Sequence, residues 1–304
     1  MIDLRIGHAA KGFRPMPVAM RQLVPLVISS VLAVAMPGIA LAQASAAEPS
    51  APEAGASERR APDLPEPVQC PGCWAPAIET SWQWQLQGPV DTSLDVDMYD
   101  VDGFEVPKGV VSGLHADGST VVCYISSGSW ERWRPDASRF PERVLGRSNG
   151  WPGERWLDVR RMAVLRPIME RRIDMCARKS FDAVEFDNVD GYANNSGFPI
   201  TGADQLRYNV FLANAAHRRG LSALLKNDLG QIRTLLPYFD AALNEQCHQY
   251  DECGRLDAFV DAGKAVFGVE YKLELGEFCP TANAHGFNFL KKRFALGPWR
   301  RACR

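Results

Sequence analysis

The chain has 304 residues, of which 46% are hydrophobic and 23% are charged, and its formal net charge is -2 at pH 7. These values are typical of globular domains and exclude a wholly disordered chain, a collagen-like repeat and a polytopic membrane protein. The 34 Lys and Arg residues are balanced by 36 Asp and Glu residues, so no basic excess indicates a nucleic-acid-binding protein.

The first 42 residues have the organisation of an export signal. Basic residues precede an almost entirely apolar segment at 23–40, and Ala40-Leu41-Ala42 has the small residues of a cleavage site. An uncleaved membrane anchor is the alternative, but Pro25 and Pro37 interrupt an apolar run that is short for a membrane span. We therefore predict a signal peptide, a secreted or periplasmic protein, and no stable membrane insertion after cleavage.

Residues 43–69 consist largely of Ala, Pro, Glu and Ser and offer almost nothing to bury. Such a composition cannot offset the conformational entropy of the chain, so the segment is predicted to be a flexible linker. The folded domain is then expected over residues 70–304, which is close to the usual length of one (β/α)8 barrel.

Short apolar runs alternate with helical patterns along this domain, as is typical of parallel α/β proteins. Eight strands are predicted, at residues 81–87, 95–102, 120–126, 182–188, 221–227, 241–247, 265–271 and 287–292. Helices are predicted at residues 161–179, 204–219, 231–239 and 255–262. Eight strands with intervening helices favour a closed (β/α)8 TIM barrel over an open doubly wound sheet. No Gly-x-Gly-x-x-Gly follows a strand, so dinucleotide binding is not indicated.

Polar residues close most of the predicted strands, and in a TIM barrel the C-terminal strand ends carry the chemistry. Side chains alternate between the faces of a strand, so Val184 and Phe186 are expected to face the helices and Asp187 the barrel mouth. Glu245 is expected to point inward by the same alternation. Either acid alone is also compatible with a helix cap or a solvated loop. Two opposed carboxylates, however, are what glycoside hydrolysis requires, since one donates a proton to the leaving oxygen and the other attacks or positions water.

Five ordered segments are similar to those of a known family: CYISSGSWERWRPD (123–136), VEFDNVDGY (184–192), LLKND (224–228), NEQC (244–247) and VFGVEY (266–271). Over residues 80–300 the chain resembles the endo-α-1,4-polygalactosaminidases, glycoside hydrolase family 114. The resemblance implies a (β/α)8 barrel, endo cleavage of an α-1,4-linked galactosamine polymer, Asp187 as nucleophile and Glu245 as acid/base, with retention of configuration. A non-catalytic carbohydrate-binding barrel and an exo-α-galactosidase-like hydrolase remain as alternatives.

Further polar residues near the strand ends are candidates for substrate binding: Tyr124, Asn188, Asp190, Lys226, Glu270 and Tyr271. Lys226 is expected to orient Asp187 and keep it ionised or to contact a sugar hydroxyl, and a structural ion pair is the alternative. The acidic strand ends fit a cationic polysaccharide substrate, because a polymer with free amines is attracted to negative charge.

The eight cysteines are expected to form disulfides, because export implies an oxidising compartment. Cys123 is expected on the outer face of a strand and Cys176 on the helix before the next strand, so these two are predicted to pair. Cys247 and Cys253 are predicted to close a short loop after Glu245. The pairing of the other four is left open, and these are Cys70, Cys73, Cys279 and Cys303.

No metal site and no cofactor are predicted. The five histidines show no ligand spacing, and Cys70-Pro71-Gly72-Cys73 has no second cysteine pair at the distance of a zinc ribbon. In an exported chain this motif is expected to take part in a disulfide.

Overall fold

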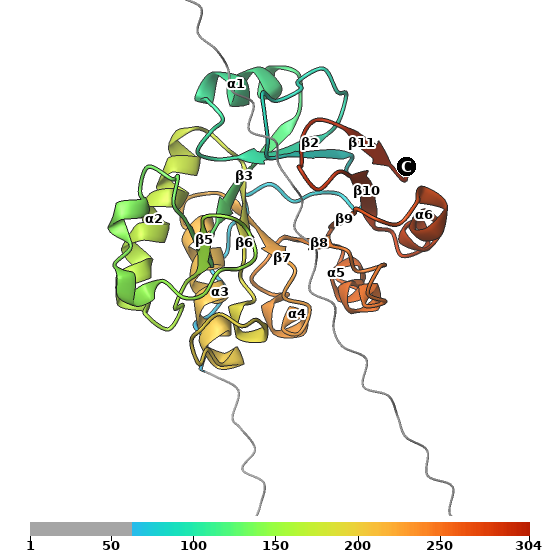
Figure 1. Cartoon of the computed structure of the whole chain (residues 1–304). Helices are drawn as coiled ribbons and strands as arrows, with labels where there is room; N and C mark the ends of the chain where they lie inside the picture. The colour runs from blue at the N-terminus through green and yellow to red at the C-terminus, as the bar shows by residue number, and fades with distance from the viewer. Residues whose placement is uncertain (1–62) are drawn as a thin grey trace, which may run out of the picture. The chain divides into compact units, whose positions relative to one another are not determined.

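The computed structural model describes residues 63–304 (Figure 1). The predicted signal peptide and most of the predicted linker lie outside these residues. The last linker residues, however, contact the folded domain. The Val68 amide donates a hydrogen bond to Asn214 Oδ1 (2.7 Å), and the Tyr238 hydroxyl donates to the carbonyl of Pro65 (2.8 Å). Contacts of the domain therefore begin before Cys70, the predicted boundary.

Eight parallel strands form the barrel, and each lies within a predicted segment. Their order in the sheet is β1 (Trp82–Gln85), β2 (Met98–Asp102), β3 (Thr120–Ser126), β6 (Ala183–Asp187), β7 (Ser222–Lys226), β8 (Ala241–Glu245), β9 (Val266–Glu270) and β10 (Asn288–Lys292). The fold is therefore the predicted (β/α)8 TIM barrel.

A C-terminal segment that was not predicted lies along the seam of the barrel. Strand β11 (Arg300–Ala302) pairs antiparallel with β10, and the amide of Leu86 donates to the carbonyl of Leu296 (2.9 Å) just after β1. Arg300 Nη1 also donates to the carbonyl of Trp82 (2.8 Å). The last residues of the chain therefore connect the first and last strands of the barrel.

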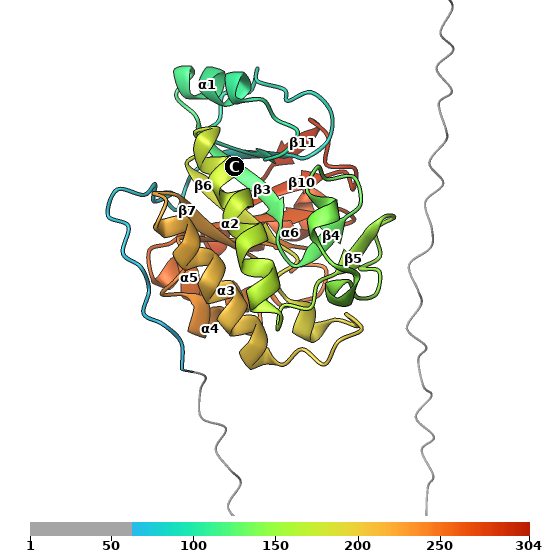
Figure 2. The ribbon, with the colours of Figure 1, turned by 90° about the vertical axis from the view of Figure 1, so that its left-hand side faces the viewer.

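The helices lie outside the strands (Figures 1 and 2). Four coincide with predicted segments: α2 (Met162–Arg178), α3 (Gly202–His217), α4 (Ile232–Leu235) and α5 (Asp257–Asp261). Two helices were missed, α1 (Lys108–Ala116) and α6 (Leu275–Ala284), because the glycines of α1 and the proline of α6 lower helix propensity. Short 3-10 turns occupy Ala137–Arg139, Glu142–Val144, Gly191–Ala193 and Cys253–Leu256. Among residues 63–304, no helix is long and apolar enough to cross a membrane.

A small hairpin interrupts the connection between β3 and α2. Strands β4 (Ser129–Glu131) and β5 (Glu154–Trp156) pair antiparallel there. Buried ion pairs hold this connection, since Arg134 Nη2 lies 2.6 Å from Asp102 Oδ2 and Arg172 Nε lies 2.8 Å from Asp136 Oδ2. The hairpin is thereby tied to β2 on one side and to α2 on the other.

The core has two parts, as the period of two along the strands requires. Val184 and Phe186 pack into the helix layer, whereas Ala183 of the same strand packs inside the barrel. Large apolar side chains, among them Trp82 and Phe267, fill the barrel interior. The remaining inward-facing residues at the C-terminal strand ends are polar, and the candidate site lies there.

All eight cysteines are paired. The structure contains the two predicted disulfides, Cys123–Cys176 and Cys247–Cys253. The pairs that were left open are Cys70–Cys73 and Cys279–Cys303.

Candidate active site

Three neighbouring strands end in charged side chains that meet at one point. Lys226 closes β7, and its Nζ lies 3.1 Å from Asp187 Oδ1 at the end of β6 and 3.1 Å from Glu245 Oε2 at the end of β8. The two oxygens are therefore separated by at most twice that distance. The side chain of Lys226 is 1% exposed, whereas those of Asp187 and Glu245 are 17% and 27% exposed. The two carboxylates thus reach solvent and the ammonium group between them does not.

Asp187 is held through its second oxygen. Tyr124 OH donates to Asp187 Oδ2 (2.8 Å), and Asn188 Nδ2 donates to the same oxygen (3.0 Å). Burial and the charge of Asp187 raise the pKa of Tyr124 well above its ordinary value, so the phenol stays a donor. Asn188 has a φ of +61°, a left-handed conformation that asparagine tolerates. Its carbonyl lies against Gly128, where a Cβ atom would clash.

Glu245 is held in a similar way. Tyr271 OH donates to Glu245 Oε1, and the Glu245 amide donates to Asn227 Oδ1 (3.0 Å). Burial, followed by the charge of Glu245, raises the pKa of Tyr271 well above its ordinary value, so this phenol also stays protonated. Each carboxylate of the site therefore accepts a hydrogen bond from one tyrosine.

A second layer of acids lies below, and sequence reasoning did not assign it to the site. Glu185 is fully buried; it accepts from Trp84 Nε1 (3.1 Å) and lies 3.1 Å from Lys226 Nζ. Burial and the charge of Glu185 raise the pKa of the adjacent Asp100 well above its ordinary value, which favours the protonated form of Asp100. The strand alternation that placed Asp187 inward also places Glu185 and Asp100 inward. Both acids could therefore have been predicted from the sequence as residues of the site.

A cavity of about 270 Å³ opens beside Glu245, between the loops that follow β6, β7 and β8. Asp190 and Asp228 line it. Burial, with a contribution from Asp187, raises the pKa of Asp190 to about 6, and burial raises the pKa of Asp228 to about 8. Asp228 Oδ2 accepts from Asn209 Nδ2 (2.9 Å). The structure thus places Asp190, a predicted binding residue, next to the carboxylate pair.

Glu270 does not fit its predicted contact with sugar. Its side chain is fully buried, and Oε1 accepts from the amides of His248 (2.9 Å) and Gln249 (3.3 Å). Glu270 follows the inward-facing Val269, so it points to the outer face of the barrel. Its position indicates a role in holding the loop after β8.

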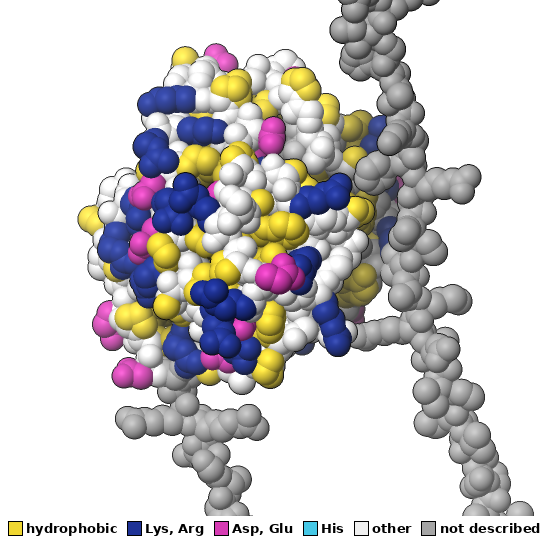
Figure 3. All heavy atoms as spheres, turned by 60° about the vertical axis from the view of Figure 1, so that its left-hand side comes forward, with side chains coloured by type: hydrophobic (Ala, Val, Ile, Leu, Met, Phe, Trp, Pro, Cys, Tyr) yellow, Lys and Arg dark blue, Asp and Glu magenta, His cyan; other side chains and the backbone are white. Residues whose placement is uncertain are grey.

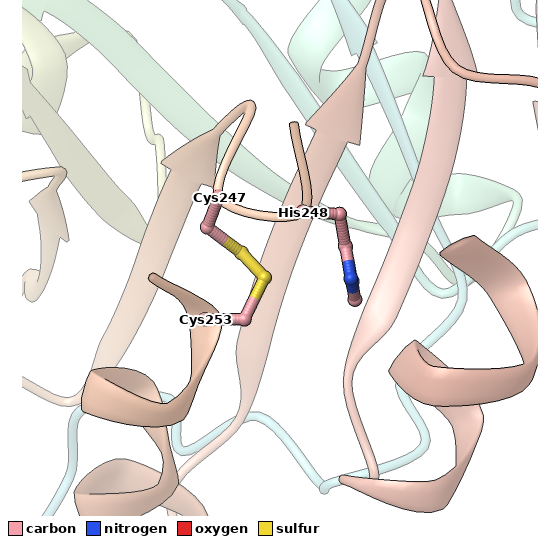
Figure 4. Close-up of side chains that lie close together, drawn as sticks. All are labelled: Cys247, His248 and Cys253. Carbon is pink, nitrogen blue, oxygen red and sulfur yellow. A yellow bond between two sulfur atoms is a disulfide. The ribbon is translucent and has the colours of Figure 1, made fainter. Parts of the chain in front are cut away.

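One group in residues 63–304 has metal-ligand chemistry, and it consists of Cys247, His248 and Cys253 (Figure 4). The two sulfur atoms are joined in a disulfide, so neither is available as a thiolate. Only the imidazole of His248 is left as a donor, and this group does not fit a metal site.

Comparison with known proteins places this geometry in a family. Residues 65–304 match the family model described as glycoside-hydrolase family GH114. The chain is similar to Ega3 of Aspergillus fumigatus, solved in complex with galactosamine, with 38% identity over 78% of this chain and 99% of that chain and a TM-score of 0.74. The glycoside hydrolase domain of PelA from Pseudomonas aeruginosa shares the fold, with 15% identity over 74% and 97% of the chains and a TM-score of 0.58. A search of curated protein sequences found no match.

Proposed function

Because the chain belongs to glycoside hydrolase family GH114 and is a glycoside hydrolase, we propose that it cleaves an α-1,4-linked galactosamine-type polysaccharide internally and with retention of configuration. In this proposal Asp187 is the nucleophile and Glu245 is the acid/base. The observation that carries it is the placement of these two carboxylates on either side of Lys226.

The short separation of the carboxylates supports retention. Asp187 Oδ1 and Glu245 Oε2 are each 3.1 Å from one nitrogen. Twice that distance is an upper bound for these two oxygens, and it accommodates the roughly 5–5.5 Å between the carboxyl groups of retaining enzymes. Asp187 can therefore reach the anomeric carbon directly while Glu245 protonates the leaving oxygen.

Lys226 would serve both halves of such a reaction. Before attack, Asp187 is ionised and Glu245 carries the proton. After attack, Asp187 is esterified to the sugar, and Glu245, now ionised, takes a proton from the water that releases the product. Lys226 therefore faces one negative charge from this pair in both states, and the negative charge moves between two oxygens that its Nζ contacts at 3.1 Å each.

The proposed substrate class is supported by the acidic residues of the site and by one related structure. Ega3, 38% identical over most of both chains, was solved with galactosamine. Asp190, Glu252 and Arg255 are among the residues that line the cavity beside Glu245, and the charges of Asp190 and Glu252 would attract the amines of a galactosamine polymer. On the face shown in Figure 3, by contrast, Lys and Arg side chains are interspersed with Asp and Glu. The four disulfides support the export that the N-terminal sequence predicts.

Product analysis tests the proposal. The purified protein is incubated with deacetylated and with N-acetylated polygalactosamine, and the products are sized over time. We expect the deacetylated polymer to shorten first into oligosaccharides. Release of monosaccharide from the first time point would instead indicate exo action, and binding without cleavage would indicate a non-catalytic barrel.

Substitution of the carboxylates assigns the two roles. Asp187→Asn and Glu245→Gln are nearly isosteric, so we expect both variants to fold and to lose at least about 10³-fold in kcat. Proton NMR of the first-formed product supplies the stereochemistry. An initial β-anomer from the α-linked polymer would mean inversion, and Asp187 would then not be the nucleophile.

A further inference from the structure

Three aromatic side chains form a row that starts at the acid/base. Tyr271, whose hydroxyl donates to Glu245, packs on Phe294 with their ring centroids 4.7 Å apart. Phe294 in turn stacks on Trp151, with centroids 5.5 Å apart and planes 29° apart. We refer to Tyr271, Phe294 and Trp151 as the aromatic row. Its members come from the end of β9, the loop after β10 and the β4–β5 hairpin, so the row joins distant parts of the chain.

The outer two rings are open to solvent. Phe294 is 54% exposed although it contacts both Tyr271 and Trp151, and Trp151 is 46% exposed although it stacks on Phe294. Large aromatic side chains are usually buried to a greater extent, and contiguous exposed apolar surface marks a binding site when it adjoins a functional centre. Phe294 and Trp151 belong to neither apolar cluster of the core, so these two rings have no evident role in folding.

The turn that carries Trp151 is fixed by hydrogen bonds. The Trp151 amide donates to Asn149 Oδ1 (3.1 Å), and the Glu154 amide donates to the carbonyl of Trp151 (3.1 Å). Asn149 Nδ2 also donates to Glu154 Oε2 (2.7 Å). The exposed indole is therefore presented by an ordered turn, and the turn would lose little conformational entropy when a ligand binds to it.

We propose that the aromatic row is a sugar-binding subsite that receives the apolar face of a pyranoside unit of the polymer. This inference rests on the proposed function and extends it. In a galactopyranoside the axial O4 lies on one side of the ring, which leaves the hydrogens of C3, C4 and C5 on the other. That apolar face matches the exposed faces of Phe294 and Trp151 in size and polarity.

The position of the row predicts how the polymer crosses the site. The cavity with Asp190 and Asp228 lies on the β6–β8 side of Glu245, and the aromatic row lies on the β9–β10 side. Sugar units would then bind on both sides of the scissile bond, by charge in the cavity and by ring stacking along the row. Occupied subsites on both sides are what internal cleavage requires.

Substitutions that remove only the ring test the subsite. Trp151→Leu and Phe294→Leu keep an apolar side chain, and we expect each to raise KM for deacetylated polygalactosamine about tenfold while kcat changes less than twofold. Trp151→Tyr keeps a ring and is expected to restore most of the affinity. Trp133→Leu is the matched control, since Trp133 is 49% exposed and is outside the row.

A binding measurement separates this inference from the proposed function. In an Asp187→Asn background, calorimetric titration with a galactosamine oligosaccharide is expected to give about tenfold weaker binding for Trp151→Leu than for Trp133→Leu. Equal affinities for these two variants, with a parent enzyme that cleaves the polymer, would overturn the subsite alone. A fall in kcat at unchanged KM would also overturn it, because the row would then act on Glu245 through Tyr271. A parent protein that neither binds nor cleaves the polymer would refute the proposed function instead.

Discussion

Lys226 lies within 3.1 Å of three carboxylates, those of Glu185, Asp187 and Glu245. Its Nζ also lies 4.5 Å from the ring centroid of Trp84. Burial alone would lower the pKa of Lys226, but the charges of the three acids outweigh it and raise this pKa well above its ordinary value. Lys226 is therefore positively charged at neutral pH. Its side chain is 1% exposed, so it acts on the substrate through Asp187 and Glu245 and not by direct contact.

We expect Asp100→Asn to make the protein more stable at neutral pH. The pKa of Asp100 is raised in the folded state, so the folded protein binds a proton that the unfolded chain releases above about pH 4. Stability therefore falls as pH rises from that value, and Asn removes this loss while it keeps a donor for Glu185. Each kcal/mol gained corresponds to about 2–4 °C in Tm.

Thermal melts at pH 4 and pH 7 measure this effect. The variant and the parent are expected to differ little at pH 4, and the difference in Tm is expected to grow toward pH 7 in favour of Asp100→Asn. A variant that is less stable than the parent at pH 7 would show that Asp100 is ionised in the folded protein.

Asp190 is expected to make substrate affinity depend on pH. Its pKa of about 6 means that it is mostly neutral at pH 5 and mostly ionised at pH 7. If the polymer is cationic, KM should fall about fivefold over this range, which corresponds to about 1 kcal/mol, the upper end of what one solvent-exposed ion pair contributes. Asp190→Asn should remove the slope. Asp228→Asn should leave the slope unchanged, because a group with a pKa of about 8 stays neutral in this window. A slope that survives Asp190→Asn would assign it to another group.

The disulfides of the domain close loops of different lengths. The Cys279–Cys303 disulfide has a sequence separation of 24 and ties the C-terminal segment to α6, whereas Cys70–Cys73 has a separation of 3. A longer closed loop restricts the unfolded chain more. The C-terminal segment also contacts β1 along the seam, and the Cys279–Cys303 disulfide therefore stabilises the closure of the barrel.

Removal of each disulfide in turn measures this difference. The double substitution of Cys279 and Cys303 to Ala is expected to lower the free energy of unfolding by roughly 2 kcal/mol more than the same change at Cys70 and Cys73. Denaturant unfolding of the two variants gives both values. Equal losses would mean that the C-terminal segment does not contribute to barrel closure.

Within residues 63–304, side chains such as Trp82 and Phe267 fill the barrel interior below the charged layer, and the cavity beside Glu245 opens at the C-terminal strand ends. The hairpin β4–β5 and the loop after β10 extend over this end and bring Trp151 to Phe294. Asp187 and Glu245, the proposed catalytic pair, thus lie between an acidic cavity and an aromatic row.

The sequence by itself determined the eight barrel strands and the inward direction of Tyr124, Asp187 and Glu245. This was possible because strand alternation and polar strand ends are local patterns, which neighbouring residues along the chain define. Two disulfides also followed from this local pattern, because the elements that carry them are adjacent in any barrel of this type.

Only the tertiary structure decided the rest. Strand β11, the contact of Lys226 with three acids, the raised pKa of Asp100 and the stacking of Trp151 on Phe294 all depend on segments far apart in the chain. For Glu270, strand alternation next to the inward-facing Val269 already indicates an outward direction, and only its burial under the loop after β8 depends on the tertiary structure. Burial and the distances between charges are set by packing of the whole barrel, and no local pattern encodes them.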